Sequence, residues 1–431
     1  MRPVRVAVLV VAGVTLAAAC TRTNAPRAAI TLPPGASGSG GPSAPPSEPN
    51  PLCKAPPTPS PPVPKPAGAL PPAIVRVATQ VQQVRGLSFK RTVVPEPVSR
   101  QEIERQLRTS LDADFPPDLA AREGRTWVTI GAIPAGTDLR RAVVDYGTSQ
   151  IIGFYDIQTH RLVFQGGTSP TPYQRFTLAH ELTHALQDQN FGLARLDELS
   201  ATCQDERAEA LLSLTEGDAV ETQIRWASQE LSPDEINQLQ REANSFPPPP
   251  ASIPRFVQQM FLFPYGPGQA FVEALLARGG EKAVNSAFRN PPVSTEQILH
   301  PNRYPSDVPQ AVEIADLSRR LGPGWTLLDQ EEVGEGWLQL LLELRLPTRE
   351  SEDAAAGWDG GLMRAWSKGS ETAVLIRTVW DTERDATEFA ATMGGWIESQ
   401  AAEVDRSGTT VLVLFGSDRP ALDALRAAAG P

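Results

Sequence analysis

Residues 171–192 read TPYQRFTLAHELTHALQDQNFG, and this stretch decides both the local fold and the chemistry that we expect from the chain. His180 and His184 are four positions apart, so on an α-helix both imidazoles lie on one face and can point at a single ion. Glu181 borders the same face, where a carboxylate can take a proton from a metal-bound water. The chain has only four histidines, so chance rarely produces this spacing. The pattern predicts a zinc site with His180 and His184 as ligands and Glu181 as general base.

The residues around the two histidines predict that they lie in a helix. Thr171 is a favourable N-cap, Pro172 suits the first helical position, and Gln174 completes the spacing of a capping box. Apolar residues recur at helical spacing, and Asn190 with Gly192 forms a stop signal. The alternative for two histidines in a buried helix is a pair of hydrogen-bonded core side chains. The adjacent glutamate favours the metal site.

A catalytic zinc ion needs a third protein ligand and an open position for water. Residues 203–226 have apolar side chains at helical spacing and carry several acidic residues. We choose Glu216 as the third ligand because it lies among apolar residues and precedes Gly217, which would let another backbone come close. Glu209 is the main competitor, and otherwise a candidate for orienting a ligand histidine. For either glutamate the simpler alternative is a solvated helix face.

The stretch from Thr177 to Gln187 resembles the active-site helix of gluzincin metallopeptidases, the thermolysin-like class that binds zinc through two histidines and a downstream glutamate. Residues 216–219, Glu-Gly-Asp-Ala, are similar to the glutamate-bearing helix of several gluzincin branches. The resemblance covers residues 151–226. It implies a zincin-like catalytic domain, zinc bound by the two histidines and Glu216, Glu181 as catalytic base, and hydrolysis of peptide bonds.

Hydrolysis of a peptide by an activated water passes through a tetrahedral oxyanion, which needs a hydrogen-bond donor besides the metal ion. His300 and Tyr304 are our candidates for this catalytic role, because they follow a predicted short helix that begins at Ser294. Residues 292–304, which contain both side chains, also look like a segment of exported bacterial zincins. The alternative is that either side chain serves packing or lies on the surface.

Ahead of the histidine helix, residues 151–155 and 161–165 predict two short strands joined by a polar turn. In zincins such a strand forms the upper edge of the cleft and binds an extended peptide by strand addition, because an unpaired edge offers backbone groups that a peptide can satisfy. An ordinary hairpin is an equal alternative. Residues 87–94 and 127–130 also look strand-like.

The first residues of the chain are typical of a signal peptide. Arg2 and Arg5 precede an apolar run over residues 6–19, which is shorter than the roughly 20 residues that span a bilayer as a helix. Cys20 follows small residues and resembles the lipidated cysteine of a bacterial lipobox. This resemblance implies export, diacylation of Cys20 and a membrane anchor on the outer face of the cell membrane. Simple secretion is the alternative.

Proline, serine, glycine and alanine dominate the residues after Cys20, up to residue 72, and such a composition predicts an extended tether. Cys53 lies inside the tether, and Cys203 lies near the predicted metal-binding helices. In an exported protein the two remaining cysteines are a candidate disulfide pair. A bond between them would pin the tether onto the catalytic domain.

The sequence therefore predicts an α+β protein in four parts: a signal peptide (1–19), a tether (20–72), a mainly helical zincin-like catalytic domain with a short edge-strand sheet (73–305), and a small C-terminal α+β domain (306–431). In the last part the pattern predicts strands and helices in the order strand 363–367, strand 373–379, helix 383–400, strand 410–415, helix 419–428.

The net charge of −11 argues against nucleic acid as a partner and against a polybasic membrane contact. The expected function is a zinc metallopeptidase that acts on peptides or proteins and reaches the membrane through its lipid anchor. Two alternatives stay open: a zinc amidohydrolase acting on a cell-wall amide, and a non-catalytic surface binding protein with a zincin fold. The presence of Glu181 argues against the second, because binding zinc does not require the base.

Overall fold

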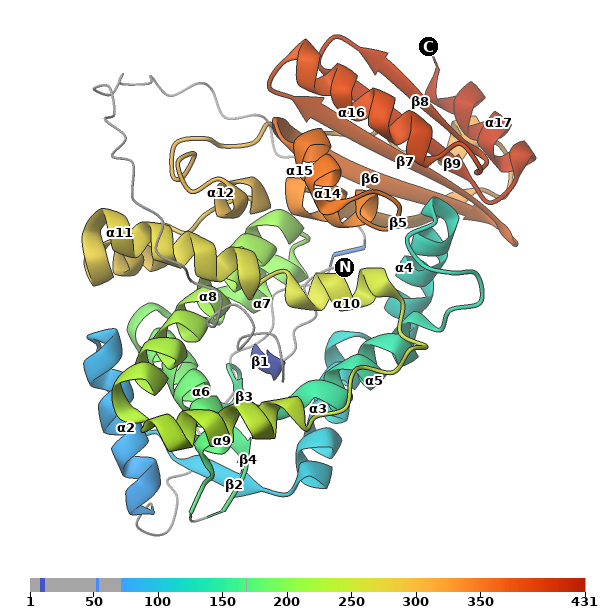
Figure 1. Cartoon of the computed structure of the whole chain (residues 1–431). Helices are drawn as coiled ribbons and strands as arrows, with labels where there is room; N and C mark the ends of the chain where they lie inside the picture. Colours follow the sequence, from blue (N-terminus) through green and yellow to red (C-terminus); the bar gives the residue numbers. More distant parts are fainter. Residues whose placement is uncertain (1–7, 12–51, 54–70, 168, 431) are drawn as a thin grey trace.

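The computed structural model describes residues 8–11, 52–53, 71–167 and 169–430 (Figure 1). Cys20, with its predicted lipid anchor, and most of the predicted signal peptide and tether lie outside these residues. Within the described ranges, no helix combines the length and the apolar character that crossing a membrane requires. Helices dominate the first part of the described chain and a five-stranded sheet dominates the end, so the protein is α+β, as predicted.

The mainly helical region contains the predicted metal-binding helices. Its helices are α2 (Pro72–Arg85), α3 (Arg100–Asp114), α4 (Pro117–Ile130), α5 (Leu139–Gln150), α6 (Pro172–Phe191), α7 (Arg195–Ala201), α8 (Asp205–Glu230), α9 (Pro233–Asn244), α10 (Arg255–Leu262), α11 (Gly266–Arg289) and α12 (Thr295–Leu299). Helices α6 and α8 pack against each other, and α2 and α11 pack around this pair (Figure 1).

Helix α6 begins and ends where its sequence signals predict. The Thr171 side chain accepts a hydrogen bond from the Gln174 backbone, and the Gln174 side chain accepts one from the Thr171 backbone, which completes the capping box. Gly192, with φ of 77°, ends the helix. Almost the whole length of α6 is buried, so its polar residues must find partners inside the protein.

A small sheet covers α6 and has the strand order β1-β3-β4-β2. Strands β3 (Ile151–Asp156) and β4 (Arg161–Gln165) form the predicted antiparallel hairpin, and β2 (Pro95–Val98) joins β4 in parallel. On the other side of β3, the segment β1 (Val8–Val11) pairs antiparallel, with Val8 opposite Tyr155 and Val11 opposite Ile151. The outer edge of β3 therefore accepts an extended segment by strand pairing.

Two strand predictions are wrong. Residues 127–130 form the last turn of α4, which Gly131 ends with φ of 79°; a short apolar run does not separate a strand from a buried helix turn. Residues 87–94 form no strand, because Gln82 and Gln189 side chains accept hydrogen bonds from backbone amides in this segment and replace a strand ladder. The strand β2 begins only after them.

Helices α8 and α11 touch backbone to backbone at Gly217. A Cβ atom at Gly217 would lie 2.1 Å from the Gly268 carbonyl carbon, and a Cβ at Gly268 would lie 2.1 Å from the Ser213 carbonyl oxygen. Real Cβ atoms do not approach other atoms so closely, so both positions require glycine. The close approach expected beside Glu216 is present, and the approaching backbone is α11.

The C-terminal region is an antiparallel sheet with order β5-β6-β7-β9-β8 and helices on both faces (Figure 1). Its elements are α13 (Ser318–Leu321), β5 (Thr326–Glu332), α14 (Glu335–Leu342), α15 (Thr348–Ala355), β6 (Trp358–Lys368), β7 (Glu371–Trp380), α16 (Glu383–Trp396), β8 (Ala402–Ser407), β9 (Thr410–Gly416) and α17 (Arg419–Ala429). Alternate residues of β7 point to opposite faces. Val374 packs in the cluster that contains α16, and Leu375 in the cluster that contains α17.

The helical region and the C-terminal sheet share one hydrophobic core. Trp127 of α4 packs edge-on against Phe256 of α10, with ring centroids 5.0 Å apart, and Phe256 packs in turn against Trp337 of α14. The same buried cluster continues into the sheet through Ile376. The C-terminal sheet therefore packs against the helical region that contains the predicted metal-binding helices.

Candidate metal centre

Helix α6 buries the three residues of the zinc-binding pattern. His180, Glu181 and His184 are fully buried. The two imidazoles lie one helical turn apart with ring centroids 4.6 Å apart, and their planes are almost perpendicular. Two histidines one turn apart can present nitrogen atoms to the same point beside the helix.

Glu216 of α8 completes the cluster. Its Oε2 atom lies 3.1 Å from His180 Nε2 and 3.6 Å from His184 Nε2. The ligand atoms of the three residues all lie within 4.8 Å of one another, and all three side chains are buried. The structure thus brings together the three predicted ligands, and this cluster could hold a metal ion.

The hydrogen bonding of His184 suits a ligand. Its Nδ1 lies 2.8 Å from Gln187 Oε1, an acceptor, so Nδ1 carries the proton and the lone pair is on Nε2. Among the described residues, buried Nε2 has no hydrogen-bond partner. A buried nitrogen without a partner is costly, whereas a metal ion would satisfy it. The residues present therefore fit a bound metal ion.

A buried network holds Gln187 in place. The Gln187 side-chain amide donates hydrogen bonds to Asp218 Oδ2 at 2.8 Å and to the Thr215 carbonyl at 2.9 Å. Asp218 forms an ion pair with the fully buried Arg85 of α2, at 2.8 Å, and Arg85 also contacts Glu281 of α11. The chain thus orients His184 through residues from four helices.

The charges of the centre depend on one another. Burial would raise the pKa of Glu216, but the hydrogen bond with His180 and the neighbouring imidazole of His184 outweigh it and lower the pKa. Burial lowers the pKa of His180, so its neutral, metal-binding form is favoured. Burial, and then the charge of Glu216, raise the pKa of Glu181 well above its usual value. The raised pKa favours the protonated form of Glu181 when no cation lies beside it.

Glu181 lies directly beneath β3. A Cβ atom at Gly153 would lie 3.2 Å from the Thr177 methyl group and 3.4 Å from Glu181 Cγ, so the missing side chain brings the strand close to the helix. Both carboxylate oxygens of Glu181 are buried and make no side-chain hydrogen bond among the described residues. Glu181 therefore lies at the contact between α6 and β3, the strand whose outer edge pairs with an extended segment.

Tyr265, which the sequence analysis missed, also lies at the centre. Its ring stacks beside that of His180, with the ring centroids 6.4 Å apart. Burial, and then the charges of Glu216 and Glu181, raise the pKa of Tyr265, so its hydroxyl keeps its proton. In the sequence, residues 264–268 indicate only a turn, and a turn does not indicate the direction of the Tyr265 side chain.

The structure does not bring His300 and Tyr304 to this cluster. His300 Nε2 lies 2.7 Å from Glu335 Oε1, and Tyr304 donates a hydrogen bond to the Asn290 carbonyl at 2.6 Å. Glu209 is also not beside the ligand histidines in the orienting role considered for it. That role belongs to Gln187, which lies one turn after His184 on the same helix face.

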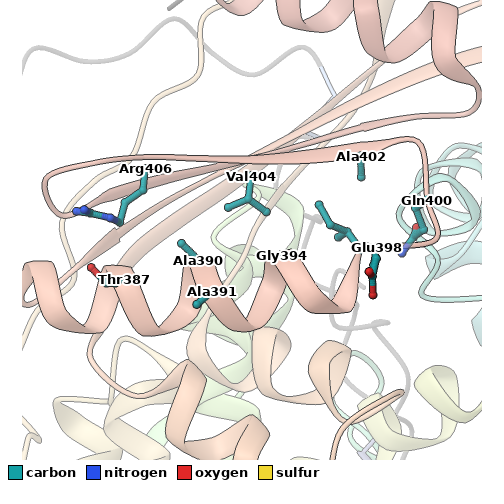
Figure 2. Close-up of a pocket in the computed structure, with 10 residues that line it drawn as sticks. Thr387, Ala390, Ala391, Gly394, Glu398, Gln400, Ala402, Val404 and Arg406 are labelled. Carbon is teal, nitrogen blue, oxygen red and sulfur yellow. The ribbon is translucent and has the colours of Figure 1, made fainter.

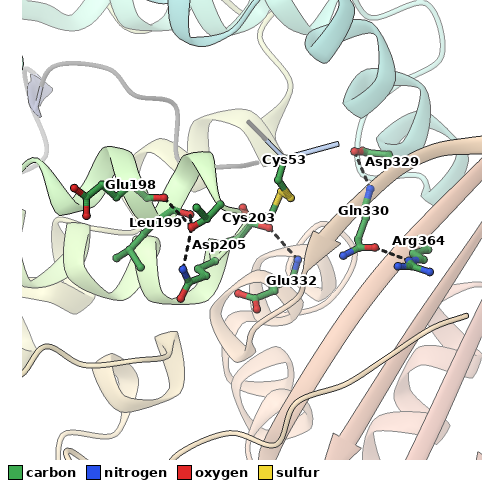
Figure 3. Close-up of a disulfide and its surroundings, with 11 residues drawn as sticks. Cys53, Glu198, Leu199, Cys203, Asp205, Asp329, Gln330, Glu332 and Arg364 are labelled. Carbon is green, nitrogen blue, oxygen red and sulfur yellow. Dashed lines mark hydrogen bonds between the residues drawn. A yellow bond between two sulfur atoms is a disulfide. The ribbon is translucent and has the colours of Figure 1, made fainter. Parts of the chain in front are cut away.

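Cys53 and Cys203 form a disulfide bond, with their Cα atoms 5.7 Å apart (Figure 3). Cys203 lies between α7 and α8, two residues before α8 begins. The bond joins the tether sequence to the loop just before the helix that carries Glu216. Cys20 lies outside the described residues.

A hollow between α16 and β8 is separate from the metal centre (Figure 2). Small and apolar side chains line much of it, including Ala390, Ala391 and Val404. None of the three candidate metal ligands lines it. We therefore assign the hollow no part in the site.

Comparisons with known proteins add little to this geometry. Residues 325–426 match a family described as a domain of unknown function (DUF8575). No curated protein matches the chain. Among solved structures, a protein from Chloroflexus aurantiacus described provisionally as a hydrolase with a novel fold is 19% identical, with 55% of this chain and 90% of that chain covered and a TM-score of 0.36.

Proposed function

We propose that this protein is a zinc-dependent peptidase of the gluzincin type. The observation that carries the proposal is the buried cluster of His180, His184 and Glu216, whose ligand atoms lie within 4.8 Å of one another beside Glu181. Two imidazoles and one carboxylate are a ligand set of catalytic zinc sites in hydrolases. A cluster that served structure alone would not need a second, unpaired carboxylate next to it.

Zinc held by His180, His184 and Glu216 would supply a Lewis acid and an activated water. The chain supplies the proton transfers. Glu181 accepts the proton of the attacking water and passes it to the departing amine. A nearby positive charge lowers the pKa of a buried carboxyl, so metal binding prepares Glu181 to act as a base.

Tyr265 is the hydrogen-bond donor that we assign to the oxyanion. Tyr265 is buried beside His180, and its raised pKa keeps the hydroxyl protonated. A donor fixed in a site without water stabilises developing negative charge more strongly than a solvated donor. This assignment replaces the roles first considered for His300 and Tyr304.

The outer edge of β3 supports a peptide as substrate. The segment Val8–Val11 pairs with β3 in the antiparallel direction, directly above the helix that carries Glu181. Pairing of this kind uses backbone groups that every peptide has, so it provides affinity with little dependence on sequence. A peptide paired in this way would pass its backbone over the metal cluster.

The proposal includes export and anchoring through a lipid on Cys20. Support comes from the sequence pattern before Cys20 and from the Cys53–Cys203 disulfide, a bond typical of oxidising compartments outside the cytoplasm. In the producing cell, a Cys20→Ser variant is expected in the soluble extracytoplasmic fraction, and the unchanged protein in the membrane fraction. Equal membrane association of both proteins would reject the lipid anchor.

The catalytic proposal is tested by cleavage of a mixed peptide library by wild-type protein and by Glu181→Gln, each with and without a chelator. We expect cleavage by the wild type alone, abolished by the chelator and restored by zinc. A wild-type protein that binds zinc, leaves peptides intact and cleaves a cell-wall amide would favour the amidohydrolase. Unimpaired cleavage by Glu181→Gln would reject the proposed base.

A further inference from the structure

The two candidate ligand histidines direct the same ring nitrogen toward Glu216. Glu216 Oε2 lies 3.1 Å from His180 Nε2 and 3.6 Å from His184 Nε2. A metal ion held by both imidazoles at this point is bound through Nε2, so the proton of each neutral ring lies on Nδ1. Ligand histidines almost always donate this second N–H group to a nearby acceptor. Each histidine therefore needs one further residue that holds its Nδ1.

The structure meets this need for His184 and leaves it open for His180. Gln187 Oε1 lies 2.8 Å from His184 Nδ1. His180 is fully buried, and among the described residues its Nδ1 has no hydrogen-bond partner. A buried polar atom without a partner is costly. We therefore looked for an acceptor close to His180.

Gln223 of α8 is a second buried side chain with unused hydrogen-bonding atoms. It is fully buried, and neither its Oε1 nor its Nε2 has a hydrogen-bond partner in the part of the chain that the structure describes. One atom is an acceptor and the other a donor. An apolar side chain of similar size would fill this position at a lower cost in free energy. Stabilisation of the fold therefore does not explain the amide.

The position of Gln223 places its amide beside His180. Gln223 follows Glu216 by seven residues, so both lie on the same face of α8, and α8 packs against α6. Side chains of an α-helix lean toward its N-terminus, so Gln223 leans toward Glu216 and the imidazole that Glu216 contacts. Burial lowers the pKa of His180, and the Gln223 amide is among the groups that oppose this effect. The amide is therefore close enough to act on the ring.

A glutamine can partner His180 in both neutral forms of the ring. When Nε2 donates to Glu216, Nδ1 is an acceptor, and the amide can offer its N–H group. When Nε2 holds a metal ion, Nδ1 carries the proton, and the amide can offer its oxygen. The terminal torsion of glutamine is broad and roughly two-fold, so a half turn exchanges the two atoms at little cost. An ionised carboxylate could partner only the second form.

We propose that Gln223 is a positioning residue of the metal centre, whose side-chain oxygen accepts the hydrogen bond from His180 Nδ1 and fixes the ring with Nε2 toward the ion. Gln223 and Gln187 then form a matched pair of uncharged acceptors, one for each ligand histidine. The inference rests on the proposed function and adds to it the residue that orients the first ligand.

The test measures zinc affinity, by competition with a chromogenic chelator, and the melting temperature of the zinc-free protein. Gln223→Met keeps the approximate size of the side chain and removes the acceptor, so zinc affinity should fall about 10- to 100-fold. The same change removes two buried polar atoms that make no hydrogen bond among the described residues, so the zinc-free melting temperature should stay unchanged or rise. Loss of a residue that only stabilised the fold would lower this temperature.

Two further variants and one spectroscopic measurement complete the test. Gln223→Glu keeps an oxygen at this position and should bind zinc more tightly than Gln223→Met. Gln229→Met makes the same change near the exposed end of the same helix and should alter neither quantity. Should Gln223→Met fail to fold, NMR of zinc-loaded wild-type protein with isotope-labelled histidine tests the same bond. The expected signal is a proton on His180 Nδ1 with a nuclear Overhauser contact to the Gln223 side chain.

Zinc affinity that Gln223→Met leaves unchanged would overturn the inference, while wild-type cleavage of peptides would leave the proposed function intact. A loss of affinity that Gln223→Glu does not relieve, with a lower zinc-free melting temperature in both variants, would indicate a general packing role and also overturn it. So would a His180 Nδ1 without a proton in the zinc-loaded protein. If the wild type binds no zinc, the proposed function fails and the inference with it. If zinc binding follows the expected pattern but no peptide is cleaved, the inference holds and the peptidase reaction alone fails.

Discussion

Replacing Gly217 with alanine should disturb both the fold and the metal centre. The new Cβ atom would lie 2.1 Å from the Gly268 carbonyl carbon and 2.2 Å from its oxygen. Ordinary van der Waals contact begins near 3.4 Å, so α8 and α11 must move apart by about 1 Å. Both contacts are with backbone atoms, which cannot rotate away as a flexible side chain could.

We expect Gly217→Ala to lower the free energy of unfolding by about 3 kcal/mol, at the upper end of the range for overpacked cores. With an unfolding entropy of about 2.1 cal/mol/K per residue over roughly 360 folded residues, that corresponds to a fall in melting temperature of about 4 °C. Glu216 is the adjacent residue, so the same movement displaces a metal ligand and should weaken zinc binding by about tenfold or more.

The assay is thermal unfolding of zinc-free and zinc-loaded protein, together with zinc competition against a chromogenic chelator. Gly394→Ala is the matched control, because it also lies inside a helix, α16, and a Cβ atom there would meet nothing within 4 Å. The control should be neutral or slightly stabilising. A Gly217→Ala protein with unchanged melting temperature and zinc affinity would refute the packing argument.

Three further predictions concern the centre and the buried carboxyl group of Glu209. Gln187→Met removes the group that orients His184, so zinc affinity should fall about 10- to 100-fold. The change also leaves the Asp218 carboxylate and the Thr215 carbonyl without a buried donor, so the melting temperature of the zinc-free protein should fall as well. Unchanged affinity in chelator competition would count against the orienting role. Tyr265→Phe should lower kcat by about 100-fold at unchanged zinc content, and full turnover would remove Tyr265 from the mechanism. Because the folded-state pKa of Glu209 is raised to about 8, folding favours its protonated form, and this contribution to stability is lost as pH rises from about 4.5 to about 8. Glu209→Gln should therefore reduce the fall in melting temperature between pH 5 and pH 8, and parallel pH profiles of the two proteins would contradict this.

The helix that carries the two histidines was predictable because its signals are local. The Thr171 capping box, Pro172 and Gly192 act within one turn of each helix end, and they specify α6 without any tertiary contact. The choice of Glu216 also came from a local feature, the small residue Gly217 beside it. A glycine at this position predicts that another backbone approaches closely, and the backbone of α11 does so.

The residues that the sequence did not reveal reach the centre from distant parts of the chain. Arg85 ends α2 and pairs with Asp218, and Tyr265 enters from the turn before α11. Their roles depend on how the helices pack, and the spacing of apolar residues along the sequence does not reveal that packing. The strand predicted over residues 127–130 was wrong for a related reason. Trp127 lies in a helix and packs against Phe256 of another helix, and an apolar side chain does not by itself distinguish this position from one in a sheet.

The most direct test of the account is the metal content of purified, metal-supplemented protein, measured by mass spectrometry on the wild type, Glu216→Gln and Glu181→Gln. The account predicts one zinc per chain in the wild type and in Glu181→Gln, because the base is not a ligand, and a marked loss in Glu216→Gln. A wild-type chain without stoichiometric zinc, or a Glu216→Gln chain that binds it as tightly as the wild type, would contradict the central claim.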